Sequence, residues 1–156
     1  MLSAAPHFLG PIPTIERGRM RSSILLAALV AIGCGGPSYT AADMATTPTP
    51  VADVFGCLRQ QLQAIGFAQS SIDTDDHRLT ARRYDETARR PDVKFRRMVD
   101  VLEMDVHPDT GNQARLIVAE KTFAEYFTER GQLLQQETAS ERVRAAGQAV
   151  VTACGR

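Results

Sequence analysis

The sequence predicts an α+β domain, a two-layer sandwich in which a four-stranded antiparallel sheet carries an N-terminal and a C-terminal helix on one face. Two observations predict this fold. Apolar residues recur at helical spacing at both ends of residues 51–156, and four segments of strand character lie between them. A domain of this length buries roughly two thirds of the surface that its unfolded chain exposes, so we expect it to fold independently.

The first helix is predicted over residues 51–65. Thr49 and Pro50 supply a cap and a first helical residue, and Gly66 stands where a left-handed C-terminal cap is expected. The apolar stripe of this helix consists of Val51, Val54, Phe55, Leu58, Leu62 and Ile65.

The second helix is predicted to follow a capping box over residues 138–141, with Thr138 as the N-cap and Glu141 as the third helical residue. Its apolar face runs out to Cys154. That face consists of Val143, Ala146 and Val150.

Four strands are predicted between the helices, over residues 67–73, 78–84, 93–106 and 114–127. Residues 74–77 and 107–112 interrupt them as turns, and the second turn contains the Pro-Asp-x-Gly order that favours a tight turn. A polar loop over residues 85–92 joins the two hairpins. Two successive hairpins predict a single antiparallel sheet.

The N-terminal region has the parts of an export signal. In MRSSILLAALVAIGCGG, residues 20–36, a basic start at Arg21 precedes an apolar run over residues 24–32 and then small residues. The run is shorter than the roughly 20 apolar residues that a transmembrane helix needs. We expect translation to begin at Met20, with residues 1–19 reflecting a misassigned start or a disordered leader.

The end of this signal, Ala31-Ile32-Gly33-Cys34, resembles the lipobox of bacterial lipoproteins, with Ala31 where that motif commonly has Leu. The resemblance implies that residues 20–33 are removed, that Cys34 carries diacylglycerol, and that the new amino terminus receives a further acyl chain such as palmitate. It also implies a lipid-anchored, extracytoplasmic place in the cell envelope. The alternative is an ordinary secretory signal with a coincidental cysteine.

In a host with two membranes we expect the periplasmic face of the outer membrane, because Gly35 is not the aspartate that retains lipoproteins at the inner membrane. The segment after the cysteine is rich in Gly, Pro, Ser, Thr and Ala. We therefore expect residues 34–50 to be the lipidated cysteine and a flexible linker, followed by the folded domain over residues 51–156.

Three cysteines are an odd number for an exported protein, unless one of them carries lipid. Cys57 and Cys154 then remain, one in each predicted helix, and antiparallel neighbouring helices bring them together. We expect a disulfide between them, because such a bond persists outside the cytoplasm. The alternative is two separately buried thiols.

The charge of the chain balances at 18 basic and 18 acidic residues, but residues 78–97 contain eight basic and three acidic ones. Arg82, Arg83, Arg96 and Arg97 are the candidate anion-binding residues of this basic cluster, for lipid head groups, lipopolysaccharide phosphates or acidic polymers. The alternative is a solvated face neutralised by carboxylates on neighbouring strands. Nucleic acid is not an expected partner in that compartment.

Two acidic segments are candidate metal sites. Residues 105–109 place two carboxylates and an imidazole together, and residues 73–77 alternate acidic side chains in a loop. Neither has a zinc or EF-hand spacing, so both are interpreted as turns, and no metal or other cofactor is predicted. No nucleophile elbow and no phosphate-cradling glycine loop is present, so no catalytic residue is assigned.

These observations favour a membrane-anchored, non-enzymatic binding or assembly module, whose partner is another envelope protein or an anionic polymer. An anionic-lipid or small-ligand binder that uses residues 78–97 is the first alternative. An envelope hydrolase is the second alternative, and no motif in the sequence supports it.

Overall fold

A computed structural model describes residues 39–156, so the predicted leader, signal and lipidated Cys34 lie outside the described residues. Along the chain the elements are β1 (Thr40–Thr47), α1 (Val51–Ala64), β2 (Ala68–Asp73), β3 (Arg78–Asp85), β4 (Phe95–Asp109), β5 (Gln113–Thr128), β6 (Gly131–Glu137) and α2 (Glu141–Cys154). A short 3₁₀ turn, Thr110–Asn112, links β4 to β5.

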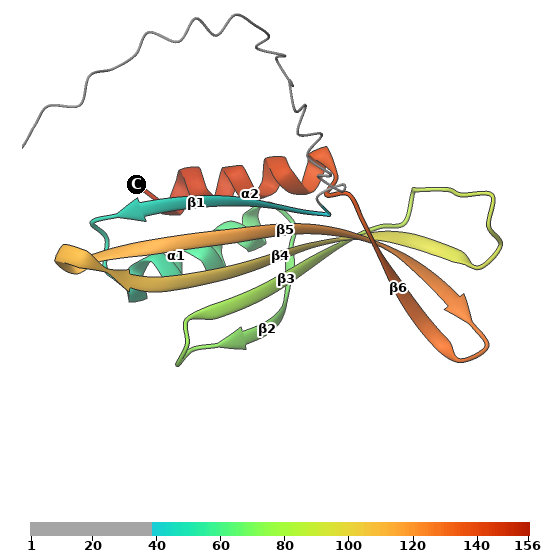
Figure 1. Ribbon diagram of the computed structural model, residues 1–156, viewed down its shortest axis with the longest axis horizontal. Coiled ribbons are helices and arrows are strands. Elements are labelled where there is room, and N and C mark those ends of the chain that lie inside the picture. The colour runs from blue at the N-terminus through green and yellow to red at the C-terminus, as the bar shows by residue number, and fades with distance from the viewer. Residues whose placement is uncertain (1–38) are drawn as a thin grey trace, which may run out of the picture. The chain divides into compact units, whose positions relative to one another are not determined.

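The sheet of this region has six strands, all paired antiparallel, in the order β1-β5-β4-β3-β2 (Figure 1). The sixth strand, β6, pairs with β5 at the same edge as β1. β1 pairs with residues 114–121 of β5, and β6 pairs with residues 122–128 of the same strand. The α+β class is therefore confirmed, and the prediction of a four-stranded sheet is wrong.

Strand β1 also corrects the predicted linker. Residues 40–47 lie in a strand, so the segment between Cys34 and the folded domain is much shorter than residues 34–50. Ala41 packs against the hydrophobic core, and the buried Thr47 hydroxyl donates a hydrogen bond to the carbonyl oxygen of Arg156 at 2.5 Å. These Ala and Thr residues extend because β5 offers them an unpaired edge, and their own hydropathy pattern does not indicate a strand.

The sequence did not predict strand β6, because all its residues except Leu133 and Leu134 are Gly, Gln or Glu and nearly all of them are exposed. It folds back on β5 after a turn at residues 129–130, and Gly131 adopts φ 107°, a conformation that side chains other than glycine rarely allow. Its pairing with β5 fixes it as a strand, although neither of its faces is buried.

Both helices follow their predicted apolar stripes. The buried residues of α1 include Leu58 and Leu62, and α1 ends before Gly66, which adopts φ 76° as a left-handed cap residue does. Helix α2 begins two residues later than predicted. Its N-cap is Ser140, whose hydroxyl accepts a hydrogen bond from the Val143 amide at 3.1 Å, so the predicted capping box at Thr138 is wrong.

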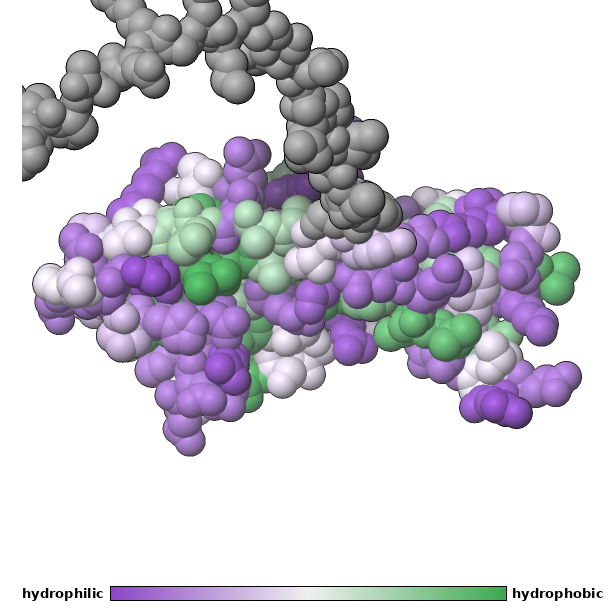
Figure 2. Space-filling model, viewed as in Figure 1, coloured by the Kyte–Doolittle hydropathy of each residue, from purple (hydrophilic) through white to green (hydrophobic). Residues whose placement is uncertain are grey.

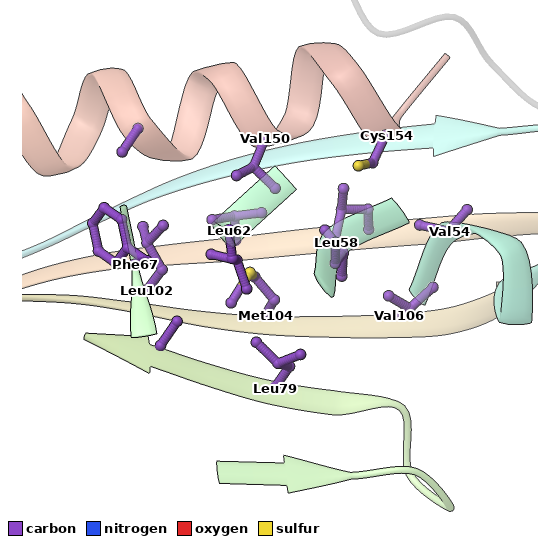
Figure 3. Close-up of a cluster of buried hydrophobic side chains, with 14 of the residues drawn as sticks. Val54, Leu58, Leu62, Phe67, Leu79, Leu102, Met104, Val106, Val150 and Cys154 are labelled. Atoms are coloured by element: carbon purple, nitrogen blue, oxygen red, sulfur yellow. The ribbon is translucent and has the colours of Figure 1, made fainter. Parts of the chain in front are cut away.

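One hydrophobic core joins the two helices to one face of the sheet (Figure 3). Helix α1 contacts β2, β4 and β5, and α2 contacts β1, β4 and β5. Alternate residues of the long central strands point into this core, as a strand period of two requires. They are Leu102, Met104 and Val106 of β4 with Ala114, Leu116 and Val118 of β5.

The predicted disulfide is confirmed. Cys57 of α1 and Cys154 of α2 are bonded, with 5.8 Å between their Cα atoms and 97 residues between them in sequence. The bond links the first helix to the last, so it closes a loop that contains five of the six strands, β2 to β6.

Candidate functional site

The sheet continues beyond the helices at one end. We call this part, residues 86–98 and 124–137, the distal end; it comprises the β3–β4 loop, the start of β4, the end of β5 and β6. Figure 1 shows β6 and the β3–β4 loop extending past the two helices. The hydrophobic core of the described chain takes no residue from these segments. Other interactions must therefore hold the distal end together.

A buried carboxylate organises one face of the distal end. The Glu125 side chain is fully buried and accepts hydrogen bonds from Arg97 Nε at 2.6 Å and from Arg96 Nη1 at 3.0 Å. Arg97 stacks 3.8 Å over the Tyr84 ring, and Arg96 stacks 4.9 Å over the Phe127 ring. The hydrogen bonds to Glu125 raise the pKa of Arg97. Cation–π contacts and ion pairs here replace an apolar core.

A second arginine fastens the β3–β4 loop. Arg90 Nη1 lies 2.6 Å from the Glu137 carboxylate and 3.2 Å from the Tyr126 hydroxyl, and the guanidinium stacks 5.3 Å from the centre of the Phe95 ring. The hydrogen bonds to Glu137 raise the pKa of Arg90. The loop, β4, β5 and β6 are thereby joined through one side chain.

The structure does not bring the four candidate anion-binding arginines into one patch. Arg96 and Arg97 share Glu125, whereas Arg83 lies on the opposite face of the sheet and contacts Asp100 at 3.5 Å. Arg82 lies across the strand from Arg83, and its Nε is buried without a hydrogen-bond partner. Three of the four charges are thus already paired. Anion binding by this set stays a prediction.

Asp100, which the sequence reading did not single out, is the centre of a buried polar junction. Its fully buried carboxylate accepts from Arg142 Nε at 2.7 Å, from the Ser140 hydroxyl at 3.0 Å and from the Thr122 hydroxyl at 3.1 Å. Arg142 also reaches Asp85, whose pKa is lowered by the Thr87 hydroxyl and by Arg142. The junction joins β4, β5 and the start of α2, so its role is structural.

Several apolar side chains of the distal end are exposed. Val93 is 96% exposed and Leu133 is 52% exposed, and Phe127 and Leu134 are also open to solvent. Figure 2 shows apolar surface at the end where β6 lies. A shallow surface cavity of about 490 Å³ lies beside Leu133 and is lined mostly by polar residues of the two loops. A smaller cavity of about 220 Å³ adjoins it and includes Tyr126.

Basic side chains lie next to these exposed apolar residues. Lys94 and Arg130 line the larger cavity, and neither makes an ion pair within residues 39–156. Arg89 donates only to the backbone carbonyl oxygens of Glu86 and Ala88. The distal end therefore presents apolar side chains together with Lys94 and Arg130, which make no ion pair in the described region, and with the carboxylate of Glu129.

Residues 74–77 form a turn, as interpreted, but residues 105–109 lie within β4, so the interpretation of that segment as a turn is wrong. Asp105 pairs with Arg78 at 3.0 Å and Asp109 pairs with Arg115 at 2.8 Å. In the other segment, Asp73 accepts the amide hydrogens of residues 75 and 76, as a turn-capping aspartate does. Within residues 39–156 no three His, Cys, Asp or Glu side chains are grouped as metal ligands.

Comparison with known protein families and with curated proteins finds no match to this chain. Over residues 39–156, neither helix has the length and apolar character needed to cross a bilayer.

Proposed function

We propose that this chain is a lipoprotein of the bacterial cell envelope, in which lipid on Cys34 anchors a small, non-enzymatic binding or assembly module to the extracytoplasmic face of a membrane. The observation that carries the proposal is the pairing of the cysteines. Cys57 and Cys154 are bonded to each other, which leaves Cys34, at the end of the lipobox-like sequence, as the cysteine available for lipid.

The disulfide also supports the compartment. Disulfides persist in oxidising extracytoplasmic environments and are rare in proteins of the reducing cytosol. Two or three acyl chains at the amino terminus would hold the domain at a membrane almost permanently, whereas one chain binds only marginally.

The module itself is proposed to bind and not to catalyse. The arginines and carboxylates of its polar clusters are paired with one another, as at Glu125 and Asp100. Glu120 has a raised pKa but lies buried beneath α2, where a Cβ atom on Gly147 would collide with its carboxyl. None of the cavities described above is lined by it.

The test is the chemistry of the mature amino terminus. The full chain is expressed in a bacterium with two membranes, the membranes are separated by density, and the extracted protein is analysed by intact mass and by peptide mapping. We expect a chain that begins at Cys34, carries acyl mass there and fractionates with the outer membrane.

Two variants provide the controls. Cys34→Ser should accumulate without acyl mass and without processing, whereas the double variant Cys57→Ser, Cys154→Ser should keep the acyl mass because its lipidation cysteine is intact. A mature wild-type chain that starts at another residue, or that carries no acyl mass, contradicts the proposal.

A further inference from the structure

We infer that the distal end of the sheet inserts into the headgroup region of the same bilayer that holds the lipid on Cys34, with anionic phospholipid as its ligand. This inference rests on the proposed function and adds the orientation of the module. It assigns an interaction surface to the exposed apolar residues at the distal end, which no other part of the described chain covers.

The apolar side chains of this surface come from the β3–β4 loop and from β6. Val93 projects from the loop, and Leu133 and Leu134 project from the two opposite faces of β6, so the apolar surface surrounds the end of the sheet. Contiguous exposed apolar surface on a small domain marks a contact with a protein or a membrane. The ion pairs of Glu125 with Arg97 and of Arg90 with Glu137 fix the strands and the loop that carry these apolar side chains.

The charged residues favour a bilayer as the occupant. The centres of protein interfaces are depleted in lysine, whereas lysine and arginine beside an anionic membrane extend their charged ends toward the head groups. Lys94 and Arg130 flank the apolar surface without carboxylate partners in the region described. Tyr126 lines the smaller adjoining cavity together with Lys94 and Leu133, and it combines an apolar ring with a polar hydroxyl, as interfacial aromatic residues do.

The course of β1 directs the anchor to this end. Because β1 runs antiparallel to β5, its first residue, Thr40, is the residue of β1 that lies nearest to the end where β5 finishes. Thr40 pairs with Lys121, seven residues before Thr128, which is about 24 Å along an extended strand. Thr40 follows Cys34 by six positions in the sequence, and a connection of this length spans at most about 20 Å. The anchor and the distal end can therefore reach one membrane surface together.

The experiment uses tryptophan as a reporter, because the chain contains none. The full-length lipoprotein with Leu133→Trp is extracted and reconstituted into vesicles of phosphatidylcholine and phosphatidylglycerol, with and without brominated acyl chains. Interfacial insertion reaches about 5–10 Å into the headgroup and acyl boundary, within reach of brominated lipid. We expect a blue-shifted emission that loses most of its intensity in brominated vesicles.

Ile72→Trp is the matched control. Ile72 is also a partly exposed aliphatic residue, 42% against 52% for Leu133, but it lies on β2 beside the turn at the opposite end of the sheet. Its tryptophan should keep the emission of a solvent-exposed indole in both kinds of vesicle. Formation of the Cys57–Cys154 bond and an unchanged circular dichroism spectrum establish that both variants fold.

The outcomes separate this inference from the proposed function. Flotation of the vesicles and the acyl mass on Cys34 report anchoring, and the tryptophan emission reports contact by the distal end. Anchored protein whose Leu133→Trp emission is unchanged, or is quenched no more than that of Ile72→Trp, overturns the inference and leaves the lipoprotein proposal standing. Shielding of the reporter only after a protein partner is added overturns it as well.

Discussion

The buried carboxyl of Glu120 makes the stability of the fold depend on pH. Its carboxyl is 1% exposed between β5 and α2, with one oxygen left without a hydrogen-bond partner. Burial, and secondarily the nearby Asp43 carboxylate, raise its pKa to about 7, while Arg144 on α2 acts in the opposite direction. The folded protein therefore holds a proton on Glu120 that the unfolded chain releases at lower pH.

This shift predicts that the folded state loses stability as pH rises from about 4.5 to about 7. Below that window Glu120 is neutral in both states, and above it the folded state must bury a charge. The total loss is about 3 kcal/mol. Glu120→Gln removes the titration, so the difference in unfolding free energy between variant and wild type should be small at pH 4.5 and largest at pH 8. Urea unfolding at a series of pH values measures it.

Asp43→Asn is the control for that prediction, because it removes the neighbouring charge and leaves Glu120 in place. It should shift the pH dependence toward lower pH without abolishing it. A difference between Glu120→Gln and wild type that does not grow with pH would show that the raised pKa does not affect stability.

Asp100 is the residue on which the junction at the start of α2 depends. Its carboxylate accepts from Ser140, which is itself the N-cap of the helix. Asp100→Asn should destabilise the fold by about 3 kcal/mol, because one of the two acceptor oxygens becomes an NH2 donor and Arg142 loses a charge partner. The matched control is Glu103→Gln, which breaks the ion pair with Lys121 on the partly exposed face and should cost less than about 1 kcal/mol. Equal midpoints of urea unfolding for the two variants would contradict this.

At the scale of elements, sequence patterns predicted both helices and strands β2 to β5, and of these strands β3, β4 and β5 alternate buried and exposed residues. They did not predict β1 or β6. Residues 40–47 and 131–137 carry little apolar periodicity, and their conformation is fixed by pairing with β5, a tertiary interaction. The observed N-cap is Ser140 and not the predicted Thr138, because the Ser140 hydroxyl also donates a hydrogen bond to Asp100, forty residues away in sequence.

The disulfide is the element-scale constraint that the sequence did predict. It links α1 to α2 across 97 residues, so its removal should destabilise the domain by about 4 kcal/mol, since the unfolded chain regains the entropy of an open loop. Urea unfolding of the full chain with and without reductant measures this loss. The double variant Cys57→Ser, Cys154→Ser should match the reduced wild type and should show no response to reductant.

At the scale of the whole molecule, the basic cluster shows the limit of sequence reasoning. The excess of arginine in residues 78–97 was visible, but its partners were not, because Glu125 and Glu137 lie on strands that follow later in the chain. Only the folded sheet reveals that Arg90, Arg96 and Arg97 of this cluster pair with carboxylates of the distal end. Lys94 of the cluster and Arg130 of the β5–β6 turn line the same cavity and make no ion pair in the described region.

The short connection from Cys34 to β1 gives the last prediction. If the distal end contacts the bilayer because the anchor holds it there, its effective concentration at the surface depends on the length of that connection. Inserting about 20 Gly and Ser residues before Thr40 lengthens a six-residue connection and lowers this concentration by about tenfold. Quenching of the Leu133→Trp reporter by brominated lipid should then fall, while the acyl mass on Cys34 and flotation with the vesicles stay unchanged. Undiminished quenching would mean that the distal end binds the bilayer strongly by itself, and that the short connection contributes little.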